Sequence, residues 1–454
     1  MPKKLVLIVI DGLTPEMLER AVEGQEAPAL RYLFEHGAYA RATSVFPSLT
    51  PVCMTSIVTG AAPDVHGIPH LVWYDRASKR MVEYGSSFGA IVSAGAIRSI
   101  RDTIFEMNER HISREAVTIY EALDDAGVAT AAVNVTSYRG RTWHRPTVPG
   151  LSRGAYGPRR FFYYNLFESD VTGAPLAIRN RSAGTVDAYA AAVGRWLVTR
   201  DGFDFLLFYL SDYDYASHAL GPDTAGEALV SSDRAVGALF EAAGGPDEFV
   251  ERYAVLLCSD HGQTTVTEAV RLQEAFSSLR LFRRASAVRP EVAVAASNRA
   301  GMVYRLESCG ESVRELALRL DTYKWAEAVC FLEDGEAVVR REGEDVRFDG
   351  SDESPLFDYP DGRRRVWAAL HTARAGDVLV SPALGFEFAD LGGGHHAGGG
   401  SHGSLLRADS TVPVLGVGVE PEARSITDIQ ALVLDHFGVE PPEYARNRAT
   451  PAAA

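Results

Sequence analysis

The chain has 454 residues, of which 46% are hydrophobic and 23% are charged, as in ordinary soluble globular proteins. Its formal net charge of −15 argues against a protein that binds a nucleic-acid backbone, because such proteins carry a basic face. No stretch approaches the roughly 20 apolar residues of a membrane helix, so no membrane partner is expected.

The N-terminal segment MPKKLVLIVIDG places two lysines before a hydrophobic run, as signal peptides do. The run LVLIVI has only six residues and no small-residue cleavage site follows it. The four cysteines are scattered without CxxC spacing, which predicts neither a disulfide framework nor a zinc knuckle. We therefore expect a cytoplasmic protein with reduced thiols.

Several short apolar runs end abruptly: LVLIVI is followed by Asp11-Gly12, FLLFYL by Ser211-Asp212, and YAVLLC by Ser259-Asp260-His261-Gly262. Unalternating runs of this kind are typical of strands that are buried on both faces. Helical patterns lie between them, including EMLERAVEG, AVTIYEALDDAG and DAYAAAVGRWLVTR, and TAAVNV and VPVLGVG are expected to be further strands. The alternation predicts an α/β fold with a doubly wound, mostly parallel sheet and helices on both faces. Ligands of such sheets bind outside the carboxyl ends of the strands.

The segment 46–68, FPSLTPVCMTSIVTGAAPDVHGI, carries four hydroxyls in its first eleven residues, namely Ser48, Thr50, Thr55 and Ser56. Pro51 directly follows Thr50, and Gly60 ends the run VCMTSIVT, which predicts a short helix with Thr50 as its N-cap. The N-terminus of a helix favours an anion. This stretch alone leaves open whether Thr50 only caps the helix or takes part in chemistry.

Two regions interrupt the alternation and are expected to be irregular, lid-like insertions, at about residues 75–115 and 138–185. The second contains the aromatic cluster RRFFYYNLF at 159–167, for which packing is a better explanation than stacking on a base. Residues 283–390 change to short alternating strands and predict an inserted α+β lobe. The catalytic core is then discontinuous, 1–282 and 391–445, and the chain re-enters it through the Gly-rich loop 391–404. Residues 446–454 are expected to be a flexible tail.

Acids and histidines follow the predicted strands in four places: Asp11, Asp214 with His218, Asp260 with His261, and His402. A two-zinc hydrolytic site needs about three imidazole or carboxylate ligands per ion, which is the number that these six side chains supply. Each residue also has an ordinary explanation, such as a turn at Asp11 or an Asp–His hydrogen bond at Asp214. Asp212 remains an alternative to Asp214, and His395 and His396 remain alternatives to His402.

In chain order, the motifs IDG, FPSLT with a following TG and P-x-x-HGI, D-x-x-x-H-x-x-GP, SDHG and a late HG resemble the alkaline phosphatase superfamily. Within it, they are most similar to the nucleotide pyrophosphatase/phosphodiesterase branch, the type I phosphodiesterases. The resemblance covers residues 4–75, 200–265 and 400–440 and leaves out the inserted lobe. It implies an alkaline phosphatase-like core and a hydrolase that cleaves a phosphodiester or pyrophosphate bond of a small organic phosphate or nucleotide.

The resemblance also implies a role for each residue. Thr50 matches the nucleophile, which would form a covalent phosphothreonine intermediate at a two-zinc site. Asp11, Asp260 and His261 match the ligands of the zinc ion that activates the Thr50 hydroxyl. Asp214, His218 and His402 match the ligands of the second zinc ion, although manganese or iron can take similar ligands. His66 and Gly67 match a structural turn.

One position departs from the family pattern. Leu71 stands where an asparagine usually donates its amide to a phosphate oxygen, so His70, Trp73 or Tyr74 would have to compensate, or the substrate differs. The alternatives are a phosphomonoesterase or phosphonate hydrolase on the same scaffold and, further away, a non-catalytic binding module. The expected partner is a small phosphate ester and not a nucleic-acid polymer. The sequence leaves the oligomeric state open.

Overall fold

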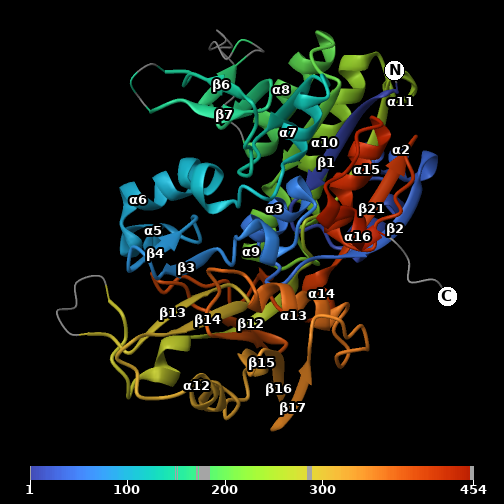
Figure 1. Cartoon of the computed structure of the whole chain (residues 1–454). Coiled ribbons are helices and arrows are strands. Elements are labelled where there is room, and N and C mark those ends of the chain that lie inside the picture. Colours follow the sequence, from blue (N-terminus) through green and yellow to red (C-terminus); the bar gives the residue numbers. More distant parts are fainter. Residues whose placement is uncertain are drawn as a thin grey trace.

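The computed structural model describes residues 2–148, 150, 152–169, 172, 185–283 and 289–449. Within these residues, the largest sheet has eight strands in the order β2-β21-β11-β1-β10-β5-β8-β9 (Figure 1). In that order, the strands are Ala38–Thr43, Thr411–Val417, Tyr253–Cys258, Lys4–Ile10, Phe205–Leu210, Thr130–Val133, Arg160–Tyr163 and Phe167–Ser169. All five runs that the sequence identifies as strands of the main sheet therefore lie in it.

Five adjacent strands of this sheet, β11, β1, β10, β5 and β8, run parallel to one another. The antiparallel strand β21 is inserted between β11 and β2, and β9 pairs antiparallel with β8 at the opposite edge. The mostly parallel, doubly wound α/β fold is thus confirmed.

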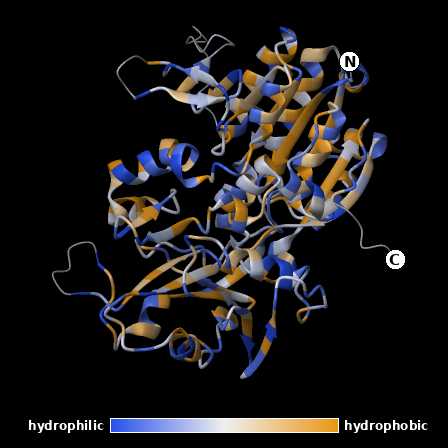
Figure 2. Cartoon of the chain, viewed as in Figure 1, coloured by the Kyte–Doolittle hydropathy of each residue, from blue (hydrophilic) through white to orange (hydrophobic). Residues whose placement is uncertain are grey.

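Both faces of the sheet are buried. Leu7 and Val9 of β1 belong to one hydrophobic core, while Ile8 and Ile10 belong to the other, because successive side chains of a strand point to opposite faces. Figure 2 shows β1 as a hydrophobic strand between helices. The first face is covered by α3 (Thr50–Thr59), α7 (Ile119–Asp125) and α15 (Ile429–His436), and the second by α1 (Pro15–Glu23), α2 (Pro28–His36), α8 (Val186–Thr199) and α10 (Gly226–Ala243).

A second, antiparallel sheet forms the lower part of the molecule in Figure 1. Helix α12 (Val313–Leu320) packs on one of its faces and α13 (Gly362–Leu370) on the other. The packing of this part begins before residue 283, since Leu272 and Phe276 contribute to its core. Its described strands, in spatial order, are β13 (Val292–Ser297), β14 (Ala300–Arg305), β18 (Val378–Pro382), β15 (Ala326–Glu333), β16 (Glu336–Arg341) and β17 (Glu344–Phe348).

A small sheet connects the two parts. Its central strand β12 (Thr264–Val270) follows the SDHG motif, and it pairs with β19 (Gly385–Phe388) and with β20 (Gly400–Ser401) of the Gly-rich loop. This pairing brings residues 400–402 beside the segment 260–264, although almost 140 residues of chain separate them.

Residues 75–115 are more regular than expected. They contain part of the hairpin β3 (Val72–Asp75) and β4 (Arg80–Glu83), then α5 (Phe88–Ala94), α6 (Ala96–Arg101) and the π-helical segment η1 (Asp102–His111). Helix α6 passes directly into η1, so the two form a continuous helical stretch with a change in its hydrogen-bond spacing.

The aromatic cluster at 159–167 is also not irregular, because it forms β8 and the beginning of β9 and extends the main sheet. Phe162 points to one core, whereas Phe161 and Tyr163 point to another. This two-residue alternation is invisible in the sequence, since both faces use aromatic side chains. The expectation that the cluster packs internally is confirmed for these three residues.

The other described elements are short. Glu443–Ala449 form α16, so the first residues of the predicted tail are helical, while 450–454 and most of 170–184 lie outside the described residues. No helix among the described residues is long and apolar enough to cross a membrane. The remaining elements are α4 (Pro63–His66), β6 (Thr142–His144), β7 (Ala155–Gly157), α9 (Asp212–Leu220), α11 (Pro246–Arg252), η2 (Leu272–Phe276), α14 (Arg407–Ser410) and η3 (Ile426–Asp428).

Candidate active site

Thr50 is the first residue of α3 and not its N-cap, so the predicted cap position was wrong by one residue. Leu49 occupies the cap position and has no side-chain oxygen to offer, and Gly60 ends the helix with φ +65°. The Thr50 hydroxyl therefore makes no capping bond. Its Oγ1 lies 3.2 Å from His261 Nε2, across the carboxyl edge of the main sheet.

The other three hydroxyls of this stretch are bound within the fold. Ser48 donates to the carbonyl of Ser404, and Thr55 donates to the carbonyl of Pro51. Ser56 Oγ lies 3.1 Å from His66 Nε2, in the turn that the family resemblance implies at His66 and Gly67. Thr50 alone of the four faces the cluster of acids and histidines.

Asp11, Asp260 and His261 form the first cluster. They follow β1 and β11, which are neighbours in the sheet. His261 Nε2 lies 3.2 Å from Asp11 Oδ1 and 3.5 Å from Asp260 Oδ2. The backbone amides of Gly12 and His261 donate to the other oxygen of Asp260, Oδ1, at 3.2 and 3.0 Å. Each carboxylate thus keeps one oxygen turned toward the His261 ring.

Asp214, His218 and His402 form the second cluster. Asp214 and His218 are one helical turn apart on α9, with His218 Nε2 3.2 Å from Asp214 Oδ2. His402 arrives from the Gly-rich loop, with its Nε2 4.0 Å from Asp214 Oδ1. The two clusters are adjacent, because the rings of His261 and His402 stack with their centroids 3.5 Å apart.

Backbone carbonyls orient two of these imidazoles. His218 Nδ1 lies 2.8 Å from the carbonyl oxygen of Gly400, and His402 Nδ1 lies 2.7 Å from that of Ser48. Since a carbonyl only accepts, both Nδ1 atoms carry the proton. Nε2 is then the ring nitrogen that faces Asp214 in both residues, and a neutral imidazole with its proton on Nδ1 ligates a metal through Nε2.

The site has an excess of buried negative charge. Asp11, Asp214 and Asp260 are at most 7% exposed, and within the described residues their ion-pair partners are histidines only. Burial, followed by the Asp11 carboxylate, raises the pKa of Asp260 well above its usual value. Burial by itself opposes a charged His261, yet the Asp260 and Asp11 carboxylates raise the pKa of His261 to about 10. Both pKa shifts indicate that a positive charge at this site is stabilised by the surrounding carboxylates.

These residues fit a metal centre. Asp11 Oδ1 and Asp260 Oδ2 are buried without a hydrogen bond, which is costly unless a cation completes the site. The ligand atoms of Asp11, Asp260 and His261 lie within 4.8 Å of one another, as do those of Asp214, His261 and His402. Carboxylate and imidazole donors are those that zinc and related divalent cations take. The acid and histidine groups of this chain could therefore hold metal.

Two residues that support the clusters were not identified from the sequence as such. Tyr209 of β10 donates its hydroxyl to Asp11 Oδ2, and Gln263 donates its amide to Asp214 Oδ1. Tyr209 is paired with Val9 in the parallel register of β10 and β1, so only the strand register reveals its contact. Gln263 directly follows the SDHG motif, and this position was the one feature of the sequence that could have pointed to its role.

The alternatives left open by the sequence have other partners. Asp212 accepts bonds from the amides of Val186 and Asp187 at 3.1 Å each, at the N-terminus of α8. His396 lies with Nδ1 3.1 Å from Glu387 and stacks on His218, whereas His395 is exposed.

The three residues that are candidate replacements for the amide donor missing at Leu71 belong to the interior. His70 is buried, with Nε2 3.2 Å from the carbonyl oxygen of Ala300 and Nδ1 accepting the amide of Val72. Trp73 packs edge-on against His111, and Tyr74 packs against Phe282. The segment after the HGI turn is therefore used for packing.

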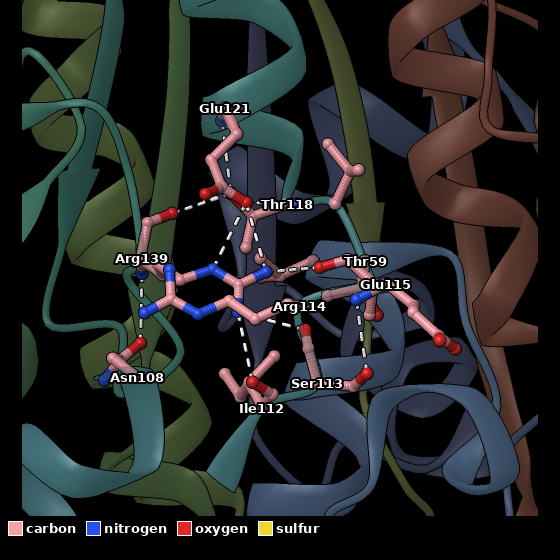
Figure 3. Close-up of polar contacts among 12 residues, drawn as sticks. Thr59, Asn108, Ile112, Ser113, Arg114, Glu115, Thr118, Glu121 and Arg139 are labelled. Atoms are coloured by element: carbon pink, nitrogen blue, oxygen red, sulfur yellow. Dashed lines mark hydrogen bonds and ion pairs between the residues drawn. The ribbon is translucent and has the colours of Figure 1, made fainter. Parts of the chain in front are cut away.

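The far end of α3, the helix that begins with Thr50, is held by a buried polar network. Arg139 donates to the carbonyls of Ile112 and Ser113 and to Glu121, each at 3.1 Å (Figure 3). This fixes the loop before α7. Gln430 then donates both to Val58 of α3 and to Val117 of that loop, so the helix is bonded to a rigid support.

The chain is similar to several known proteins. Over 284 residues the chain is 24% identical to human ectonucleotide pyrophosphatase/phosphodiesterase family member 7, a match that covers 58% of this chain and 48% of that relative. The match thus spans about half the length of the curated relative.

Solved structures with the same fold include phosphonoacetate hydrolase from Sinorhizobium meliloti 1021 in complex with phosphonoformate. It has a TM-score of 0.62 at 18% identity, with 96% of each chain covered. An inactive murine ectonucleotide pyrophosphatase/phosphodiesterase 5 in complex with AMP has a TM-score of 0.61 at 14% identity, over 97% of this chain and 96% of that one. The family model of type I phosphodiesterase/nucleotide pyrophosphatase matches residues 5–405, and the chain belongs to this family.

Proposed function

We propose that this protein is a metal-dependent hydrolase that cleaves a phosphodiester or pyrophosphate bond of a small organic phosphate or nucleotide. Thr50 is the nucleophile. Asp11, Asp260 and His261, together with the Thr50 oxygen, hold one divalent cation, and Asp214, His218 and His402 hold a second, with zinc the expected metal.

The observation that carries this proposal is the position of Thr50. Its hydroxyl oxygen lies 3.2 Å from His261 Nε2, the same atom that lies 3.2 Å from Asp11 and 3.5 Å from Asp260. A nucleophile needs to be held beside the groups that activate it, and here three segments of the chain converge on one point. The first turn of α3 adds the positive end of a ten-residue helix beside the Thr50 oxygen.

The reaction divides into two steps. The Thr50 oxygen attacks phosphorus and loses its proton to solvent, the bond from phosphorus to the leaving oxygen breaks, that oxygen takes up a proton from solvent, and the phosphoryl group is carried on Thr50. Water then cleaves the new threonine–phosphorus bond and restores the hydroxyl. Bound cations supply Lewis acidity, which lowers the pKa of a coordinated hydroxyl and offsets charge on the phosphoryl oxygens. Asp11 and Asp214 keep their orientation through Tyr209 and Gln263.

A phosphonate or phosphomonoester hydrolase is the second candidate. The similarity in fold to phosphonoacetate hydrolase over 96% of both chains favours it. Leu71, which lies where the family pattern has an amide donor, also leaves room for a substrate that is held differently.

The first experiment combines metal analysis with substrate comparison. Purified protein is expected to contain two divalent cations per chain, and to hydrolyse bis(nitrophenyl) phosphate faster than nitrophenyl phosphate or phosphonoacetate. Activity is expected to disappear with a chelator and to return with zinc. A preference for the monoester or the phosphonate would reverse the order of the two candidates.

The second experiment tests the nucleophile. Thr50→Ala is expected to abolish turnover, because the attacking oxygen is gone, while six of the seven metal-binding groups remain and the metal content stays nearly unchanged. Thr59→Ala, the same substitution at the other end of α3, is expected to retain turnover. Undiminished activity of Thr50→Ala would refute the proposed role.

A further inference from the structure

The β13–β14 hairpin of the second, antiparallel sheet brings Asn298 close to His402, one of the proposed metal ligands. Ser297 pairs with Ala300 at the end of the hairpin, so Asn298 and Arg299 form its two-residue turn. Asn298 has φ +54°, a left-handed conformation in which asparagine is one of the tolerated residues. Asn298 as a whole is only 5% exposed, and its side chain lies beside His402.

The hairpin is bonded to the loop that carries His402. The amide of Arg299 donates to the carbonyl of His402 at 2.8 Å. The buried guanidinium of Arg299 is paired with Asp409 at 2.8 Å, and the amide of Phe388 donates to the carbonyl of Asn298 at 2.7 Å. Two backbone hydrogen bonds and one ion pair therefore fix the position of Asn298 relative to His402.

The side-chain amide of Asn298 has a defined orientation. Its Oδ1 accepts a hydrogen bond from Ser297 Oγ at 2.8 Å, so its NH₂ group is turned the other way. Nδ2 lies 3.1 Å from His402 Nε2, the ring nitrogen that has no proton because Nδ1 donates to Ser48. In this structure the amide thus donates to the lone pair that the proposed function assigns to a cation.

The lone pair of His402 Nε2 cannot bind the Asn298 amide and a cation at the same time. A cation on His402 Nε2 would deprive the Asn298 N–H of its acceptor, while the anchored hairpin would keep the amide beside the site. A buried donor without an acceptor is unfavourable, so the N–H has to find another oxygen. The substrate brings such an oxygen, since the non-bridging oxygens of a phosphoryl group are strong acceptors next to a metal.

We propose that Asn298 is a substrate-binding residue whose side-chain amide donates a hydrogen bond to a non-bridging phosphoryl oxygen. The proposal rests on the function proposed above. The amide is neutral and is not a metal ligand, so it can stabilise charge that develops on the phosphoryl group without competing for the cation. Ser297 acts as a positioning residue, because the hydrogen bond from its hydroxyl prevents a flip of the Asn298 amide that would exchange its oxygen and nitrogen.

The test compares Asn298→Gly with Asp334→Gly in the full-length, zinc-loaded protein. Glycine suits the left-handed turn and deletes the amide. Asp334 is an exposed residue in the β15–β16 hairpin of the same sheet and has the same φ of +54°, so its substitution controls for the backbone change. The measurements are zinc affinity, binding of inorganic phosphate by calorimetry, and kcat and KM for bis(nitrophenyl) phosphate.

For Asn298→Gly we expect a fall in kcat of about 10²–10³-fold, the usual loss for one such donor, together with weaker phosphate binding. Zinc affinity is expected to be unchanged or slightly higher, because a competitor for His402 Nε2 has been removed. Asp334→Gly is expected to match the wild type. Asn298→Asp, which also tolerates the turn, replaces the donor with a carboxylate and is expected to weaken phosphate binding as well.

Two outcomes would overturn the inference. If Asn298→Gly binds phosphate and turns over substrate like the wild type, the amide does not contact the phosphoryl group. If zinc affinity falls in parallel with phosphate affinity, Asn298 positions His402 instead of the substrate. A wild-type protein without metal-dependent turnover is a distinct result, since it would contradict the proposed function first and this inference with it.

Discussion

Single hydrogen bonds decide which atoms of the site are available to a ligand. Tyr209 binds one oxygen of Asp11 and leaves the other facing His261. Gln263 does the same for Asp214 on the second cluster. Partners of this kind hold a ligand in one orientation, and their loss typically lowers metal affinity about 10- to 100-fold.

Tyr209→Phe is therefore expected to weaken zinc binding by about tenfold or more while the fold is retained, because only the hydroxyl is removed. Competition with a chromogenic chelator measures the change. Tyr253→Phe is the matched control, since Tyr253 is also buried but is the first residue of β11, at the end of that strand away from the site. Equal zinc affinity in the two variants would show that Tyr209 does not support Asp11.

Two aspartates join the elements beneath the site. The Asp212 carboxylate accepts the amides of Val186 and Asp187 at the start of α8. Asp187 in turn accepts the amides of Ser211 and Asp212 at the start of α9. Each carboxylate thus binds the N-terminus of the other's helix, and this reciprocal pair fixes α9, from which Asp214 and His218 project.

The reciprocal pair predicts a pH-dependent stability. Burial and the Asp212 charge raise the pKa of Asp187 from 3.8 to about 7, so the folded state holds a proton that the unfolded state has lost. The contribution of Asp187 to the free energy of unfolding is greatest below about pH 4 and declines as the pH rises to about 7. The slope is at most about 1.4 kcal/mol per pH unit.

Asp187→Asn is expected to remove most of this decline. Between pH 5 and 7 its free energy of unfolding should fall by about 2 kcal/mol less than that of the wild type, as measured by urea unfolding at each pH. Asp201→Asn is the control, because Asp201 is 59% exposed and pairs with Lys4 at the surface. An Asp187→Asn variant with the same pH dependence as the wild type would be inconsistent with a proton on Asp187.

The two parts of the molecule are joined by a buried ion pair. Arg299 of the β13–β14 turn and Asp409 of α14 are both fully buried and lie 2.8 Å apart. Removal of one partner leaves an uncompensated charge in the interior, which typically costs about 3–5 kcal/mol.

Arg299→Ala is accordingly expected to lower the free energy of unfolding by about 3–5 kcal/mol. Arg20→Ala, which breaks a surface pair with Asp223, is expected to cost less than about 1 kcal/mol. Denaturant unfolding of both variants compares them directly. Similar losses in the two would mean that the buried pair does not hold the parts together.

The sequence predicted the main sheet well because its central strands are buried on both faces and therefore appear as uninterrupted apolar runs. It also predicted that the acids and histidines follow strands and meet at one site, and the structure brings Asp11, Asp214, Asp260 and the histidines together, although His402 follows β20 of the small sheet and not a strand of the main sheet. Their assignment as metal ligands stays a prediction. The strand β8 was missed because aromatic residues on both faces conceal its alternation.

Asn298 could not have been identified from the sequence. As a turn residue between two strands, it resembles Asp334 and other hairpin residues with positive φ. Its approach to His402 depends on how the inserted sheet packs against the Gly-rich loop, through Arg299 and Asp409. Contacts of this kind arise from tertiary packing, which no local pattern encodes.

The late position of β21 in the chain has a consequence for biosynthesis. The strand lies between β2 and β11, so a nascent polypeptide that has been translated only as far as residue 400 has a vacant place within its central sheet. His402 emerges from the ribosome just before the strand that fills this place. Completion of the sheet and arrival of the last histidine of the two clusters are therefore nearly simultaneous during synthesis.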